Sequence, residues 1–122
     1  MKFLWTTIYV RNLEESIAFY SELLDLKVVK RFPAGPGREI AFMGNGADGE
    51  TLVELLADSA LSEVDLGKHI SIGFAVGSVD AMLETVKGKG IPLHGAPIET
   101  HGSKFFFIKD PNGLSIQFYG QR

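Results

Sequence analysis

The stretch WTTIYVRNLEESIAFYSELL, residues 5–24, decides the fold. Its first six residues alternate in character with a period of two, which predicts a β-strand over residues 5–10. Asn12, followed three residues later by Glu15, has the form of a capping box, which predicts that a helix begins there. Asp25 is expected to end this helix, because Asp tolerates the left-handed backbone conformation better than most residues. The helix carries a narrow, mostly apolar stripe at helical spacing, formed by Leu13, Ser16, Ile17, Tyr20 and Leu24.

The same pattern returns 66 residues later. Residues 71–76, SIGFAV, match residues 5–10, and Ser78 stands where a second helix would need its N-cap. Gly88 and Gly90 are expected to end this second helix. Its apolar residues are Val79, Met82, Leu83 and Val86, each one repeat after its counterpart in the first helix. An internal repeat of this length predicts that the fold is built from two copies of one unit.

Each predicted helix is followed by three short, strand-like segments separated by turns. The strongest turn is DPNG, residues 110–113, because Pro presets φ at the first turn position and Gly supplies a positive φ. The predicted strands are residues 27–32, 39–43 and 51–56 in the first half, and 91–93, 104–109 and 114–119 in the second.

These elements predict an α+β fold of two βαβββ modules. The repeats cover about residues 1–57 and 69–122, joined by a linker of about residues 58–68, within a single domain of 1–122. Neither half has enough residues to bury its helix face and sheet alone. We therefore expect the modules to form one curved mixed sheet, with helices on its convex side and a concave cleft that holds the functional site.

Composition excludes several classes of function. The chain has no cysteine, so disulfides, thiolate metal sites and thiol catalysis are excluded. Acidic and basic residues are interspersed, the net charge is −3, and there is no basic run of the kind that nucleic-acid-binding proteins use. No apolar stretch approaches the ~20 residues that a membrane-spanning helix needs. We expect a cytoplasmic protein that binds neither nucleic acid nor membranes.

Three stretches resemble the glyoxalase, bleomycin-resistance and extradiol-dioxygenase (vicinal oxygen chelate) superfamily. They are NLEESIAFY at residues 12–20, VEL at 53–55 and KDPNGLSIQ at 109–117. Their order and spacing cover essentially the whole chain. The resemblance implies the fold described above, a small-molecule site in the cleft, and assembly into a homodimer.

The resemblance also implies four positions where enzymes of the family hold a divalent ion. In this chain they are Trp5, Glu54, Ser71 and Gln117. Only Glu54 is a good ligand, because an indole nitrogen is a donor only and serine hydroxyl and amide oxygens bind metals weakly. We therefore expect no cofactor. If a metal is bound, the alternative set is Glu54, His69 and Gln117, since His69 lies two residues before Ser71 and shares its side of the strand.

The leading interpretation is a protein with a degenerate metal site that binds a small, planar or aromatic organic ligand. The ligand-binding candidates are Trp5, Thr7, Tyr9, Glu54, Ser71 and Gln117. One alternative is a lyase or isomerase of the lactoylglutathione lyase type, with Glu54 as the catalytic base beside a carbonyl. A third is a non-catalytic, dimerising accessory domain. For Glu54 the functional role and a purely structural one stay open at this point, and so does core packing for Tyr9.

Overall fold

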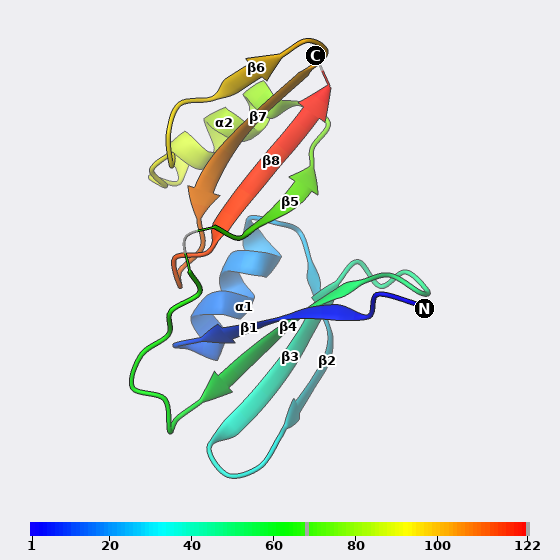
Figure 1. The fold of residues 1–122 in the computed structure, drawn as a ribbon, viewed down its shortest axis with the longest axis vertical. Coiled ribbons are helices and arrows are strands. Elements are labelled where there is room, and N and C mark those ends of the chain that lie inside the picture. The colour runs from blue at the N-terminus through cyan, green and yellow to red at the C-terminus, as the bar shows by residue number, and fades with distance from the viewer. Residues whose placement is uncertain (68, 122) are drawn as a thin grey trace. The chain divides into compact units, whose positions relative to one another are not determined.

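The computed structural model describes residues 1–67 and 69–121. The chain divides into two compact units, Met1–Leu66 and Gly67–Arg122, each with one helix and one four-stranded sheet (Figure 1). Lys68, at the end of the predicted linker, and Arg122 lie outside the described residues.

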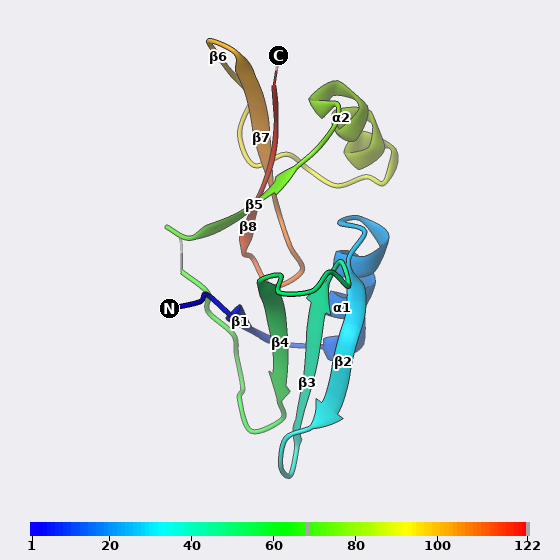
Figure 2. The same ribbon diagram turned by 90° about the vertical axis from the view of Figure 1, so that its right-hand side faces the viewer.

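The first unit has the order βαβββ. Its sheet has the strand order β1-β4-β3-β2, in which β1 pairs with β4 in parallel and the other pairs are antiparallel. The helix packs on β2, β3 and β4, on one face of the sheet (Figures 1 and 2). The elements are β1 (Trp5–Val10), α1 (Leu13–Glu22), β2 (Lys27–Pro33), β3 (Arg38–Gly44) and β4 (Leu52–Asp58).

The second unit repeats this topology. Its strand order is β5-β8-β7-β6, again with the first strand parallel to the last and the other pairs antiparallel. The second helix packs on β7 and β8. The elements are β5 (Ser71–Ala75), α2 (Val79–Gly88), β6 (Ile98–Thr100), β7 (Ser103–Lys109) and β8 (Ser115–Gln121).

The structure confirms the α+β class and the two βαβββ modules. The expectation of one mixed sheet is corrected in one respect: the strands pair as two four-stranded sheets, one in each unit. In each module the first strand pairs in parallel with the last (β1 with β4, β5 with β8), so each helix covers a four-stranded sheet within its own half. The cleft predicted to be shared by both halves stays a prediction.

Both helices begin where the sequence predicts. The side chain of Asn12 accepts a hydrogen bond from the Glu15 N–H at 2.9 Å, and Ser78 Oγ accepts one from the Ala81 N–H at 3.1 Å. These caps satisfy backbone donors that have no partner within the helix. Helix α1 ends at Glu22 with Leu23 as its C-cap, earlier than the predicted end at Asp25. The backbone of Asp25 nevertheless has the predicted left-handed conformation, with φ 58°.

The core between each helix and its sheet is filled differently in the two units. Tyr20 of α1 is fully buried, and the sheet of its unit carries the small Ala41. The residue of α2 equivalent to Tyr20 is the smaller Val86, and the sheet of the second unit carries Phe106 at the position of Ala41. Large and small side chains are therefore exchanged between helix and sheet. The in-register rows on the helix side are Ile8, Leu55 and Ala41 in the first unit, and Phe74, Phe118 and Phe106 in the second.

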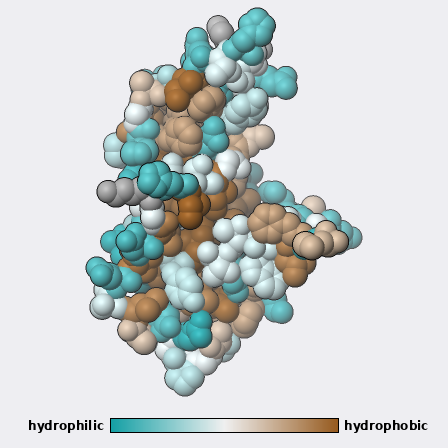
Figure 3. Space-filling view, in the orientation of Figure 1, coloured by the Kyte–Doolittle hydropathy of each residue, from teal (hydrophilic) through white to brown (hydrophobic). Residues whose placement is uncertain are grey.

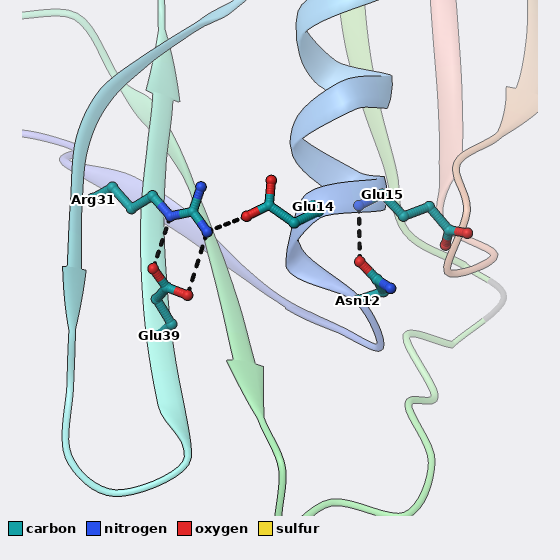
Figure 4. Close-up of polar contacts among 5 residues, drawn as sticks. All are labelled: Asn12, Glu14, Glu15, Arg31 and Glu39. Carbon is teal, nitrogen blue, oxygen red and sulfur yellow. Dashed lines mark hydrogen bonds and ion pairs between the residues drawn. The ribbon is translucent and has the colours of Figure 1, made fainter.

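An ion triad ties the first helix to its sheet (Figure 4). The guanidinium of Arg31 on β2 donates to Glu39 on β3, with Nε 2.8 Å from Oε2, and to Glu14 in the first turn of α1. These contacts raise the pKa of Arg31, and the hydrogen bond from Arg31 lowers the pKa of Glu39.

The second unit has a matching triad with the charges exchanged between strands. Lys104 on β7 is the cation; its Nζ lies 2.7 Å from Asp80 Oδ1 in the first turn of α2 and 3.5 Å from Glu99 Oε1 on β6. The hydrogen bond to Asp80 raises the pKa of Lys104. In both units the cation thus holds an acidic residue at the second position of the helix.

The loops hold one confirmed prediction and one error. Asp110 Oδ1 accepts the N–H groups of Asn112 and Leu114, each at 2.8 Å, and Gly113 has φ 88°, so residues 110–113 form the predicted turn. The predicted strand at 91–93 is wrong: this segment is irregular, and the strand of this part of the chain is β6. Pro92 has no N–H for a ladder hydrogen bond, which disfavours a strand there.

Within residues 1–67 and 69–121, neither helix has the length and hydrophobicity required to cross a membrane.

Candidate functional site

The open face of the first sheet, the face opposite α1, carries four of the six predicted ligand-binding residues. Thr7 on β1 stands in register with Glu54 on β4, and Glu54 with Phe42 on β3. In-register partners point to the same side of a sheet, and alternate residues of one strand do as well. Trp5, Thr7, Tyr9 and Glu54 therefore share this face.

Glu54 is buried, with 9% of its surface exposed. The Thr7 hydroxyl donates to its Oε1 at 2.5 Å. The other carboxylate oxygen, Oε2, makes no hydrogen bond to any residue that the structure describes. A buried carboxylate with one oxygen held and one oxygen free is an acceptor that a ligand's N–H or O–H group can reach.

A pocket of about 420 Å³ opens beside Glu54 within the first unit. Its walls are mostly apolar, with a single carboxylate and a single ammonium among the lining residues, and we call it the Trp5 pocket. It is lined by Trp5, Val29, Lys30, Phe32, Phe42, Leu52 and Glu54.

Three aromatic rings form the wall of the Trp5 pocket. The Trp5 ring meets Phe42 edge-on, with centroids 5.1 Å apart at 66°, and Phe42 in turn stacks on Phe32 at 6.1 Å and 26°. Trp5 is 44% exposed although it is a large apolar side chain. An exposed indole on this wall offers a face on which a planar molecule can stack.

The N-terminal segment adds exposed apolar residues to the first unit. Figure 3 shows hydrophobic surface on the protruding part that carries the N-terminus. The exposed side chains there include those of Met1, Phe3 and Leu4, which precede Trp5.

Lys30, Phe32 and Phe42 were not among the residues predicted from sequence. Lys30 pairs in register with Phe42, which places it in the same row as Thr7 and Glu54, and its Nζ lies 5.1 Å from the centroid of the Phe32 ring. The alternation of β2 and β3 could have indicated these residues. A bulge between Val28 and Lys30 shifts the register of β2, however, and the sequence does not reveal that shift.

The other predicted residues lie elsewhere. Tyr9 is one row beyond Thr7 on the same face, is 39% exposed, and does not line the Trp5 pocket. Ser71 and Gln117 lie on the corresponding open face of the second sheet, where Gln117 pairs in register with Gly73. His69 precedes β5 in the second unit. Their predicted roles stay predictions.

No three His, Asp or Glu side chains come together as a metal-ligand set among residues 1–67 and 69–121. The alternative set divides between the units, with Glu54 in the first and His69 and Gln117 in the second.

Comparison with known proteins identifies the family. The family model of the Glyoxalase/Bleomycin resistance protein/Dioxygenase superfamily matches residues 2–118. The lactoylglutathione lyase of Neisseria meningitidis is 31% identical over 125 residues, which cover 97% of this chain and 89% of that protein. A probable lactoylglutathione lyase of Vibrio parahaemolyticus is 28% identical over 95% of this chain and 88% of its own length.

Solved structures show the same fold. The trypanothione-dependent glyoxalase I of Leishmania major superposes with a TM-score of 0.85 at 24% identity, covering 98% of this chain and 86% of that one. A glyoxalase family protein of Bacillus cereus superposes with a TM-score of 0.78 at 20% identity, covering 99% and 94%. With the family model spanning nearly all of its residues, the chain belongs to the Glyoxalase/Bleomycin resistance protein/Dioxygenase superfamily.

Proposed function

We propose that the protein binds a small, planar organic molecule in the Trp5 pocket and does so without a metal ion. The observation that carries this proposal is the pairing of an aromatic wall with one buried acceptor. Trp5 and Phe42 supply apolar surface for a flat ligand, and Glu54 Oε2 accepts a hydrogen bond from it. Such pockets bind by apolar contact and gain specificity from a few polar groups.

The residues present do not fit a tightly bound divalent ion. Of the four positions that the family resemblance implies, Trp5 offers only an N–H donor, Ser71 a hydroxyl and Gln117 a neutral amide. Ions such as Zn²⁺ and Ni²⁺ are held by imidazole and carboxylate ligands. Glu54 is the exception, but one of its oxygens already accepts the Thr7 hydroxyl. The donor chemistry supports an organic ligand at this site.

Lys30 supports a ligand that also carries negative charge. Lys30 and Glu54 are in one row, separated by Phe42 on the strand between them, so their backbones are about 10 Å apart. A flat molecule lying over Phe42 can donate to the carboxylate at one end and place an acidic group near the ammonium at the other.

The second candidate function is a lyase or isomerase. The relatives with the names lactoylglutathione lyase and probable lactoylglutathione lyase favour it. In this case Glu54 would act as a general base, with Oε2 taking a proton from carbon beside a carbonyl and Thr7 holding the carboxylate in place.

The first experiment is a ligand screen that uses Trp5 as the reporter. Trp5 is the one tryptophan of the chain, so a change in its fluorescence reports directly on the wall of the pocket. We expect planar aromatic acids to quench or shift the emission and sugars or aliphatic amines to leave it unchanged. A screen in which flat molecules have no effect at about millimolar concentration would contradict the proposal.

Elemental analysis of the purified protein and calorimetric titration with Ni²⁺, Zn²⁺, Mn²⁺ and Fe²⁺ test the metal-free part of the proposal. We expect no stoichiometric metal and no binding at micromolar affinity. Metal bound in a way that Glu54→Gln abolishes would overturn this part and favour the lyase.

Glu54→Gln also separates binding from turnover. If the protein is a lyase, this variant retains ligand and loses the lactoylglutathione lyase reaction; if it is a binding protein, neither form is active and the variant binds more weakly. Sedimentation at several protein concentrations tests the predicted homodimer independently of either function.

A further inference from the structure

The second unit holds a polar hollow that the proposed function does not use. Its volume is about 270 Å³, and a neighbouring hollow of about 170 Å³ shares three of its lining residues. We call the two together the His94 pocket. The first is lined by His69, Ile70, Ser71, His94, Phe107 and Ser115, and the second adds Gly67, Lys109 and Gly113.

The sheet register brings these residues to one place. Ser71 on β5, Ser115 on β8 and Lys109 on β7 are in-register partners, so they form one row across the open face. The backbone N–H of His94 donates to the Phe107 carbonyl at 2.8 Å, which fixes the loop before β6 beside β7.

The chemistry of the pocket is that of hydrogen-bond donors. Imidazole, hydroxyl and ammonium groups line it, and neither hollow is lined by Asp or Glu, although the chain as a whole has a net charge of −3. Within residues 1–67 and 69–121 these side chains make no hydrogen bond or ion pair; they are those of His69, Ser71, His94, Lys109 and Ser115. Their donors are available to a ligand.

We infer that the His94 pocket binds the oxyanion of a small organic carboxylate. Two imidazoles, two hydroxyls and one ammonium match the acceptor oxygens of a carboxylate or phosphate. A metal ion is the weaker match, since only two of these groups are strong metal ligands.

The apolar side of the pocket selects an organic anion over an inorganic one. Phe107 lines it and meets Phe105 edge-on at 5.9 Å, and Phe105 stacks on Tyr119 at 6.4 Å. An aromatic carboxylate can place its charged group among the donors and its ring against Phe107. This inference does not rest on the proposed function, because no residue of the Trp5 pocket takes part.

The test is an NMR titration of the full chain with benzoate and, separately, with inorganic phosphate, each up to about 50 mM. We expect both anions to shift the backbone signals of Ser71, His94 and Ser115, with benzoate binding more tightly. Phosphate binding more tightly than benzoate would assign the pocket to phosphate-bearing ligands and overturn the choice of a carboxylate.

Matched variants locate the site. The double variant His69→Ala/His94→Ala and the single variant Lys109→Met should each weaken benzoate binding about tenfold, because each removes charge-assisted hydrogen bonds. His101→Ala and Lys87→Met change the same residue types elsewhere in this unit and should leave the affinity within about twofold.

Three results would overturn the inference: no shift with either anion, equal affinity in the pocket variants and the wild type, or shifts with Zn²⁺ or Ni²⁺ and with neither anion. The substituted side chains, those of His69, His94 and Lys109, are exposed, and the loop at His94 is held by a backbone hydrogen bond. The variants are therefore expected to fold. Signals of Thr7 and Glu54 report on the Trp5 pocket separately. Failure at one site therefore does not imply failure at the other.

Discussion

The open faces of the two sheets have the same register and opposite chemistry. The central row of the first unit carries a hydroxyl, a buried carboxylate and an aromatic ring. In the second unit the same row has a glycine in place of the hydroxyl residue, an amide in place of the carboxylate, and again an aromatic ring. The row before it holds an indole in the first unit and two hydroxyls in the second. The central rows are Thr7, Glu54 and Phe42, and Gly73, Gln117 and Phe107.

This difference shows that the repeated topology supplies positions and leaves the chemistry to individual residues. Backbone pairing fixes which side chains stand beside one another, whichever residues occupy the positions. One unit thus presents an apolar pocket with an acceptor, and the other a pocket of donors. Function within this fold must be argued from the residues, position by position.

The largest effect on stability is expected in the core. Giving the second unit the side chains of the first tests whether a large residue on the helix can replace a large residue on the sheet. Phe106→Ala should lower the free energy of unfolding by about 3–5 kcal/mol, because it leaves a cavity where β7 meets α2. Adding Val86→Tyr recreates the arrangement of Tyr20 and Ala41 and should restore part of the loss. Urea denaturation of the single and double variants measures this. A double variant less stable than Phe106→Ala would show that the two cores are not equivalent.

Trp5→Ser gives the first unit the residue that the second unit has at the equivalent position. We expect it to weaken binding of a planar ligand roughly 10- to 100-fold, because it removes the exposed indole from the pocket wall. Calorimetry measures the affinity, since the variant has lost its fluorescent reporter. Tyr9→Ala is the matched control: it removes an aromatic ring from the same strand and face but outside the pocket. An equal loss in both variants would contradict the role given to Trp5.

Glu54→Gln makes the central row of the first unit resemble that of the second. The Thr7 hydroxyl can still donate to the amide oxygen, so we expect the fold to be kept and ligand affinity to fall about tenfold. Fluorescence of Trp5 reports the change. Gln117→Ala shows whether the second unit contributes to the same ligand: a comparable loss would support the predicted role of Gln117, and unchanged affinity would confine the site to the first unit.

The smallest effect concerns the ion triads, which should respond to pH at opposite ends of the scale. Arg31 lowers the pKa of Glu39, so the stability from this pair is present above the ordinary glutamate pKa and is lost as pH falls through the lowered value. Asp80 raises the pKa of Lys104, so that pair stabilises below the ordinary lysine pKa and is lost as pH rises through the raised value.

Lys104→Arg should therefore remove the alkaline loss in the second unit, because arginine stays charged. Thermal unfolding of wild type and variant from about pH 8 to about pH 11 measures the difference. The same loss in both proteins would show that Lys104 does not contribute.

Much of the fold could be predicted from the sequence because the signals are local and occur once in each repeat. The caps Asn12 and Ser78 and the left-handed Asp25 follow from short-range patterns that the structure confirms. Glu54 was singled out by the family resemblance, and it is buried on β4 in register with Thr7. The prediction of a strand at 91–93 was wrong because it gave more weight to the apolar Ile91 and Leu93 than to Pro92, which disfavours a strand. The strand of this part of the chain is β6, farther along.

What could not be predicted depends on contacts between segments far apart in sequence. The bulge in β2 decides that Lys30 and Phe32 face Glu54, and no residue type there marks it. His94 stands in a loop rich in glycine and proline, and its backbone hydrogen bond to Phe107 holds this loop beside β7, where His94 and His69 line the same hollow. Pairings of this kind are set by tertiary structure, which a single sequence does not display.

The parallel pairing of β1 with β4 has a consequence for the order of folding. Thr7 and Glu54 are 47 residues apart, so the chain must close a long loop before the first strand finds its partner, whereas β2, β3 and β4 are joined by short turns. Loop closure of this length is slow compared with hairpin formation. We expect the meander of β2, β3 and β4 to form early and β1 to dock last. Trp5 and the Thr7–Glu54 hydrogen bond would then be assembled in the final step, so a newly made chain acquires its pocket only once folding is complete.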